Sequence, residues 1–348
     1  MPLDPELEAM LSRPEGLRLP SLRDHSPAQA RALHAAAAAS ALRTLEIEPV
    51  ESVRTFQVPT RSGDLEVRIY TPVDCPVPAP AVVYLHGGGW VLGDLDVQDA
   101  TCRHLAHRCR AVVVSVAYRL APEHPFPAAV DDSCDAVLWT HSHADQLQVD
   151  NRRIALAGSS AGGNVAAGTT LRLRDEGQSL LAAQLLLYPP TDPLLNSASV
   201  RQNGTGYYLT ADDMRCFVEA YLPDPSARSC AYAAPLHAPS LAGLPPAVVA
   251  TAGFDPLRDE GMAYAARLRA EDVHVLHLHF PQLIHGFFGF ARQSQAAARA
   301  RDEVLDAFTS LLWSAATATT TTTRNDVPEL AAPPAVSTPP TGSRRKGT

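Results

Sequence analysis

Short apolar runs alternate with helix-like stretches along most of the chain, and this alternation limits its fold more than any other feature. Runs of this length, rich in Val and Leu and joined by helices, are typical of a mainly parallel sheet covered by helices on both faces. The candidate strands are 81–86, 111–118, 153–157, 184–188, 247–252 and 274–280, and the helix-like stretches are 98–108, 127–140, 163–175, 259–270 and 294–313. The pattern predicts an α/β fold.

Two segments stand outside this alternation and are candidates for a helical cap. Residues 26–45 start with a Ser-Pro helix signal, and residues 192–245 interrupt the alternation. Inside that insertion, Thr210–Asp213 resembles a capping box, and Leu209 is placed to pack against Met214. We expect cap helices in residues 1–50, a catalytic domain in 51–315 with the insertion at about 192–245, and a strand, turn and strand over 53–71.

Composition excludes several functions. Lys346 is the only lysine, which argues against a Walker phosphate loop, a Schiff base or a Ser-Lys dyad. The net charge of -8 without a basic stripe argues against nucleic acid as a partner. The acidic N-terminus does not resemble a signal peptide, and no apolar stretch of about 18 residues could anchor the chain in a membrane, so we expect a cytoplasmic protein.

After Trp313, the Thr run and the Pro-rich segment predict disorder over 316–348.

The segment Gly158-Ser159-Ser160-Ala161-Gly162 follows a predicted strand and precedes a predicted helix. A nucleophile elbow needs this context, because a sharp turn lifts the serine above the sheet and small neighbours allow the turn. Ser160 has the correct register, with a glycine two positions away on each side. The alternative is a Gly-Ser loop that only caps the helix.

A glycine run, His86-Gly87-Gly88-Gly89-Trp90, directly follows another predicted strand. Acyl transfer produces an oxyanion, which backbone N–H groups can stabilise, and consecutive glycines let the backbone approach closely. The alternative is a flexible turn or a phosphate loop, but the run has neither the Rossmann spacing nor the Walker lysine. We expect His86 to support the glycine turn.

A serine nucleophile needs a base that is oriented by a carboxylate. Asp255 and His285 each follow a predicted parallel strand downstream of Ser160, in the order serine, acid, histidine. Asp259 and Glu260 are rival acids, but they fall in the first turn of the next helix, where the helix dipole explains them.

The remaining histidines and cysteines do not form a predicted metal site. Of the strand histidines His274, His277 and His279, only the last two share a face, and a metal would need more ligands. The six cysteines contain no C-x-x-C pair and are expected to be free. No metal or organic cofactor is expected.

Taken together, these motifs resemble the hormone-sensitive-lipase-like branch of the α/β-hydrolases, which includes many bacterial esterases, over residues 30–313. The motifs that carry the resemblance are HGGGWVLGDLD (86–96), YRLAPEHPFPAA (118–129), GSSAGGN (158–164), YP (188–189), FDPLRDEG (254–261) and HGF (285–287).

The resemblance implies an α/β-hydrolase fold and a carboxylic ester hydrolase whose partner is a small ester. It implies Ser160 as nucleophile, His285 as base and Asp255 as orienting acid, with an oxyanion hole formed by the N–H groups of Gly88, Gly89 and Ala161. It also implies a cap from residues 1–50 and about 200–222, in which Tyr207 or Tyr208 lines the pocket. Homodimers are common in that family, so a homodimer is an expectation too.

The chain departs from the family at Ser159, where an acid is usual. Serine removes a negative charge near the catalytic histidine, so the acid limb of the pH–rate profile should lie at lower pH than in a Ser159→Asp variant. Three alternatives remain open: an amide or formamide hydrolase with the same triad, a small-molecule binding module on the same fold, and a true lipase. We expect short-to-medium acyl esters, because the N-terminal region carries many charges.

Overall fold

A computed structural model describes residues 1–13, 17–42 and 47–314. Its centre is an eight-stranded sheet in the order β1-β2-β4-β3-β5-β6-β7-β8, in which only β1–β2 and β2–β4 pair antiparallel. The strands are β1 Val50–Thr60, β2 Gly63–Pro72, β3 Ala79–Leu85, β4 Val112–Val116, β5 Val149–Ser159, β6 Ala183–Leu187, β7 Ala247–Phe254 and β8 Val275–Ile284. The prediction of an α/β-hydrolase fold with a mainly parallel sheet is confirmed, and β1 and β2 are the predicted strand pair.

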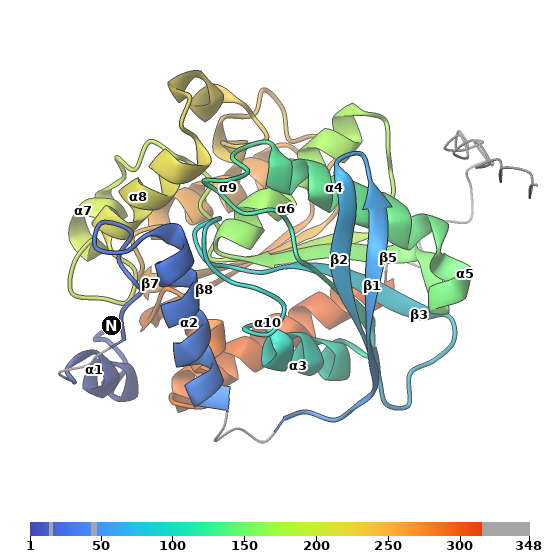
Figure 1. The fold of residues 1–348 in the computed structure, drawn as a ribbon, viewed down its shortest axis with the longest axis horizontal. Coiled ribbons are helices and arrows are strands. Elements are labelled where there is room, and N and C mark those ends of the chain that lie inside the picture. Colours follow the sequence, from blue (N-terminus) through green and yellow to red (C-terminus); the bar gives the residue numbers. More distant parts are fainter. Residues whose placement is uncertain (14–16, 43–46, 315–348) are drawn as a thin grey trace, which may run out of the picture.

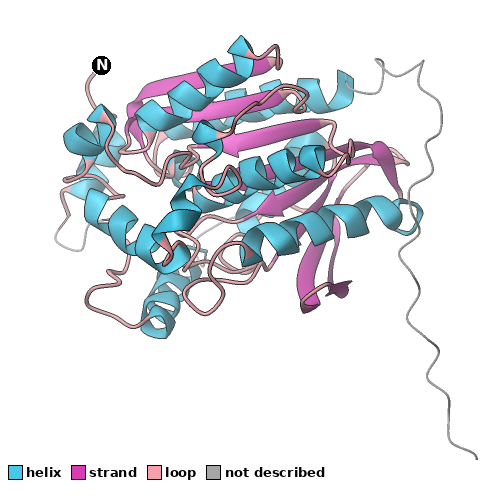
Figure 2. Cartoon of the chain, turned by 90° about the horizontal axis from the view of Figure 1, so that it is seen from above, coloured by secondary structure: helices cyan, strands magenta, loops and turns pink. Residues whose placement is uncertain are grey.

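Helices cover both faces of the sheet (Figure 1, Figure 2). On one face α3 packs against α10, and on the other α4 packs against α6, with α9 beside the last strands. The helices are α1 Pro5–Leu11, α2 Pro27–Leu42, α3 Asp99–Cys109, α4 Ala128–Ser142, α5 Ala144–Leu147, α6 Ala161–Asp175, α7 Ala198–Asn203, α8 Ala211–Tyr221, α9 Arg258–Ala270 and α10 Gln295–Ser314. The five long helices expected between or after the strands are therefore present, with ends within about two residues of those predicted.

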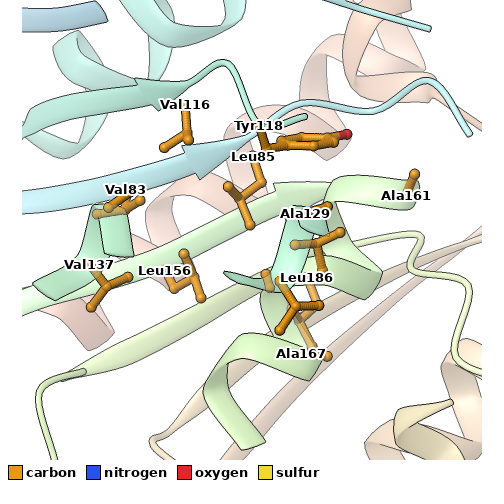
Figure 3. Close-up of a cluster of buried hydrophobic side chains, with 14 of the residues drawn as sticks. Val83, Leu85, Val116, Tyr118, Ala129, Val137, Leu156, Ala161, Ala167 and Leu186 are labelled. Carbon is orange, nitrogen blue, oxygen red and sulfur yellow. The ribbon is translucent and has the colours of Figure 1, made fainter. Parts of the chain in front are cut away.

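Strand β3 shows how the sheet divides the core into two layers. All seven of its residues are buried, and successive side chains point to opposite faces. Val83 and Leu85 belong to the apolar cluster under α4 and α6, whereas Val82 and Tyr84 belong to the cluster under α3 and α10. Figure 3 shows Val83 and Leu85 in the first of these clusters. A strand buried on both faces explains why its sequence is a continuous apolar run.

The two segments expected to form a cap contain α1, α2, α7 and α8. Helix α8 begins with the predicted capping box, in which Asp213 N–H donates to Thr210 Oγ1 and Thr210 N–H donates to the Asp213 carboxylate, both at 3.1 Å. The two segments are joined by Arg23, whose guanidinium donates two hydrogen bonds to Asp212, at 2.6 and 2.7 Å. The tail predicted over 316–348 lies outside the described residues. In the described part of the chain, no helix is long and apolar enough to cross a membrane.

Candidate active site

Ser160 sits on a sharp turn between β5 and α6. Its φ of 54° and ψ of -122° place it in a sparsely populated region of backbone space. A Cβ on Gly158 would lie 2.1 Å from the Gly162 carbonyl oxygen, so the turn requires glycine there. This is the strained strand–turn–helix geometry of a nucleophile elbow, and it projects the serine side chain beyond the strand.

The structure brings the three predicted triad residues together. His285 Nε2 lies 2.9 Å from Ser160 Oγ, and His285 Nδ1 lies 2.8 Å from Asp255 Oδ2. A carboxylate only accepts hydrogen bonds, so Nδ1 carries the proton and Nε2 is free to accept the serine proton. Asp255 is 1 % exposed, and its other oxygen accepts the Leu257 N–H at 2.8 Å, which fixes the carboxylate.

The expected oxyanion donors are the N–H groups of Gly88, Gly89 and Ala161, and of these residues Gly88 and Gly89 line the cavity that contains Ser160. None of the three donates to a carbonyl within the described ranges. Ala161 is the first residue of α6, where the helix leaves its N–H without a partner. Gly88 and Gly89 have φ of 127° and 61°, and a Cβ on Gly89 would lie 2.3 Å from Phe217 Cγ. Glycine is therefore required where the loop meets helix α8.

His86 lies beneath this loop. Its Nδ1 is 2.9 Å from Gly87 O, its ring stacks on Tyr118 at 4.3 Å, and Tyr118 Oη donates to its carbonyl. Burial lowers the pKa of His86 to about 4, so its ring is neutral at pH 7. These contacts match the expectation that His86 supports the glycine turn.

Trp90 is a site residue that the sequence reasoning missed. Its indole N–H donates to Asn164 Oδ1 at 3.2 Å, and the Asn164 amide donates to the carbonyls of Pro190 and Ala233. Trp90 therefore ties the glycine loop to the helix that follows Ser160. The adjacent motifs contained both residues, but nothing in their spacing indicated the bond.

In the described residues, the hydrogen-bond partner of the Ser159 hydroxyl is Tyr84 and not the triad histidine. Ser159 Oγ lies 3.1 Å from Tyr84 Oη, which in turn donates to Gln98 Oε1 at 3.2 Å. Burial raises the pKa of Tyr84. Three hydrogen-bonded neutral side chains thus occupy the position next to the nucleophile, and no motif in the sequence indicated Tyr84 or Gln98.

The rival acids Asp259 and Glu260 have partners elsewhere. They lie in the first turn of α9, as expected, and each also accepts hydrogen bonds from backbone N–H groups outside that helix. Asp259 accepts the Ser199 N–H at 2.7 Å, and Glu260 accepts the N–H groups of Thr191 and Asp192 at 2.8 and 3.2 Å. Burial raises the pKa of Glu260 well above its ordinary value. Through these hydrogen bonds, both side chains fix the segment 191–199, which leads into α7.

A cavity of about 270 Å³ opens above Ser160. Helices α2 and α8 contribute His34, Ala38, Met214 and Phe217, and Tyr208 lines the cavity as well. Tyr207 does not line it and instead packs on Phe254, with ring centroids 5.1 Å apart. Of the two tyrosines named as pocket residues, only Tyr208 lines the cavity.

No group of three or more His, Cys, Asp or Glu side chains in the described ranges could hold a metal ion. His277 and His279 both contact Thr251 Oγ1, at 2.9 and 3.0 Å. The six cysteines are all free thiols.

Comparison with known proteins settles the family. Residues 82–289 match the family model described as the alpha/beta hydrolase fold. The chain belongs to this family. It is 41 % identical over 281 residues to Esterase LipI of Mycobacterium tuberculosis, covering 78 % of this chain and 87 % of that protein. It is 34 % identical to an arylesterase of Saccharolobus solfataricus, covering 85 % of this chain and 95 % of that protein.

Solved structures agree with this assignment. An esterase of Pyrobaculum calidifontis superposes with a TM-score of 0.83 and 39 % identity, over 89 % of this chain and 99 % of that one. The resemblance to hormone-sensitive-lipase-like esterases is thereby confirmed, and the chain is a carboxylic ester hydrolase of that group.

Proposed function

We propose that the chain hydrolyses small carboxylic esters through an acyl-enzyme formed on Ser160. The observation that carries this proposal is the unbroken hydrogen-bonded series from Ser160 Oγ through His285 to Asp255, with contacts of 2.9 and 2.8 Å. The described parts of residues 1–50, together with α7 and α8 of the insertion, act as the cap over this site.

Acylation starts when Ser160 Oγ attacks the ester carbonyl carbon and passes its proton to His285 Nε2. The carbonyl oxygen becomes an oxyanion, which accepts hydrogen bonds from the backbone N–H groups of Gly88, Gly89 and Ala161. Asp255 stabilises the imidazolium without taking its proton. The C–O bond then breaks, and His285 delivers the proton to the departing alcohol.

Deacylation repeats these steps with water. His285 Nε2 removes a proton from a water molecule as it attacks the acyl carbonyl, and the same three amides hold the second oxyanion. His285 then returns the proton to Ser160 Oγ, which releases the carboxylic acid and restores the free enzyme.

The cavity favours short-to-medium acyl groups. A volume of about 270 Å³ lies just below the usual range for small-molecule sites, about 300–1,000 Å³. A long lipid chain would need a longer tunnel, so a true lipase is the weaker alternative. An amide or formamide hydrolase could use the same triad, whereas a binding module would have no need for it.

The test is a p-nitrophenyl ester series from acetate to palmitate, together with matched p-nitroanilides. We expect turnover to peak at short chains, amides to be poor substrates and Ser160→Ala to be inactive. A phosphonate probe should add one adduct to the wild type and to Ser159→Ala, the matched serine control, but none to Ser160→Ala. Labelling of Ser159, or no ester turnover by a folded wild type, would contradict the proposal.

A further inference from the structure

Two chemically different groups of residues line the active-site cavity. One group is apolar and consists of Leu19, Leu209, Met214, Phe217, Phe288 and Phe290. The other group carries hydrogen-bonding side chains, those of Tyr84, Gln98, Thr101 and Ser159, and the contacts Ser159–Tyr84 and Tyr84–Gln98 join three of them into one polar side. In the part of the chain that the structure describes, no Asp, Glu, Lys or Arg side chain lines this cavity, so the polar side presents hydroxyls and one amide.

The polar side has hydrogen-bond donors that no protein group in the described residues accepts. Tyr84 Oη has a single proton, which it donates to Gln98 Oε1, so it accepts the Ser159 hydroxyl proton. The Gln98 side-chain NH₂ and the Thr101 hydroxyl have no hydrogen-bond partner within the described residues. Neither atom is sealed in the core, because neither belongs to the fully buried unpartnered atoms. Both groups are therefore available to a bound molecule.

The sheet order indicates which half of an ester meets this side. The departing oxygen must reach His285 Nε2, so the alcohol half lies towards the loop after β8. Tyr84 is on β3 and Gln98 precedes α3, and β3 lies on the opposite side of β5 from β6, β7 and β8. The acyl half, which points away from His285, therefore faces Gln98 and Thr101.

We propose that Gln98 and Thr101 form an acyl-group subsite that selects esters of short acids bearing an uncharged oxygen, a hydroxyl or a carbonyl, on the acyl chain. This inference rests on the proposed ester hydrolysis. A purely aliphatic acyl chain would displace water from the Gln98 amide and leave its N–H groups without a partner, which lowers binding energy. A carboxylate on the acyl chain would find no cation along the cavity wall.

The test compares two isosteric substrates that share a leaving group, p-nitrophenyl 3-hydroxybutanoate and p-nitrophenyl 3-methylbutanoate. We expect the wild-type kcat/KM to be about tenfold higher for the hydroxy ester, the effect of one neutral hydrogen bond. Gln98→Leu should bring the ratio close to one, and the isosteric Thr101→Val should lower it. Gln146→Leu should keep the wild-type ratio, because Gln146 is an exposed residue of α5, which precedes β5 and so lies at the opposite end of that strand from Ser160.

Turnover of p-nitrophenyl acetate separates this proposal from the activity on which it rests, because acetyl is too short to reach the subsite. If acetate is hydrolysed but the wild-type ratio is one, or both variants keep the wild-type ratio, the subsite is refuted and the esterase stands. A preference for a hydroxyl only in the alcohol half would also refute it. If acetate is not hydrolysed, both proposals fail. Circular dichroism and Tm confirm that each variant is folded.

Discussion

Replacing Gly89 with alanine should disable the oxyanion hole while leaving the triad intact. The new Cβ would lie 2.3, 2.4 and 2.5 Å from three ring carbons of Phe217. Carbon atoms in contact normally stay about 3.5 Å apart or more, so the loop or the ring must move by about 1 Å. Phe217 is 2 % exposed and held within α8, which leaves the loop as the part that moves.

The size of the effect follows from two contributions. A φ of 61° costs an alanine about 1 kcal/mol, which lowers stability but not activity directly. Displacement of the Gly89 N–H removes one oxyanion donor, and the loss of such a donor lowers kcat by about 10²–10³-fold. We expect Gly89→Ala to lose about 10²-fold in kcat, with a much smaller change in KM because the ground-state ester gains little from that donor.

Gly243→Ala is the matched control. Gly243 also has a positive φ, 76°, but its nearest neighbour would be Arg174 Cδ at 3.9 Å, so only the backbone strain remains. Thermal unfolding should show a small loss of Tm in Gly243→Ala and a larger one in Gly89→Ala, and steady-state kinetics on p-nitrophenyl acetate should show a loss of kcat only in Gly89→Ala. If Gly89→Ala keeps kcat within threefold, or Gly243→Ala loses as much, the reasoning is refuted.

Three further predictions concern charges around the site. Asp255→Asn should lower kcat by about 10⁴-fold with an unchanged Tm, because an amide favours the wrong tautomer of His285; a loss below tenfold in kinetic assays would contradict the assigned role. Ser159→Asp should move the acid limb of the kcat/KM–pH profile to higher pH, whereas the neutral Ser159→Asn should not; equal profiles would exclude the effect. Glu260 has a raised pKa in the fold, so its contribution to stability is present below its ordinary pKa and is lost as pH rises through the folded value. Glu260→Gln should therefore gain Tm relative to the wild type as pH is raised, and a constant difference would contradict this.

The fold was largely predictable because each element has a local signal. Strands buried on both faces, such as β3, are continuous apolar runs, and helix α8 begins at a capping box that the residue types specify. The short helices α5 and α7 were missed. Helix α7 depends on Ser199, whose N–H donates to Asp259 sixty residues later, and such a contact leaves no periodic signal in the sequence.

The triad was predictable for a different reason. Ser160, Asp255 and His285 each follow a parallel strand, and the carboxyl ends of parallel strands meet at one edge of the sheet. Tyr84 and Gln98 were not predictable, because their contact depends on how the loop before α3 returns over β3. The sequence thus indicates the residues that react more readily than those that shape the space around the ester.

The glycine loop depends on both cap segments for its position. From the insertion, Phe217 packs against Gly89, and Tyr221 stacks on Trp90 with ring centroids 4.5 Å apart and planes 3° apart. From the N-terminal segment, Arg31 on α2 donates to the carbonyl of Val91 at 2.7 Å. Helices α2 and α8 therefore touch the loop at three successive residues.

In the proposed mechanism, these contacts give the cap segments a role in positioning the oxyanion donors as well as in lining the cavity. A loop of consecutive glycines has many accessible conformations, so an ordered oxyanion hole requires contacts from outside the loop. Arg31 also donates to Ala121 O and pairs with Glu123, which fixes α2 to the body of the fold. Preorganised donors lower the barrier to acyl transfer. A substrate that is too large and pushes α2 or α8 outward therefore displaces these donors, and it loses transition-state stabilisation as well as binding affinity. The size limit of the cavity is therefore expressed in kcat as well as in KM.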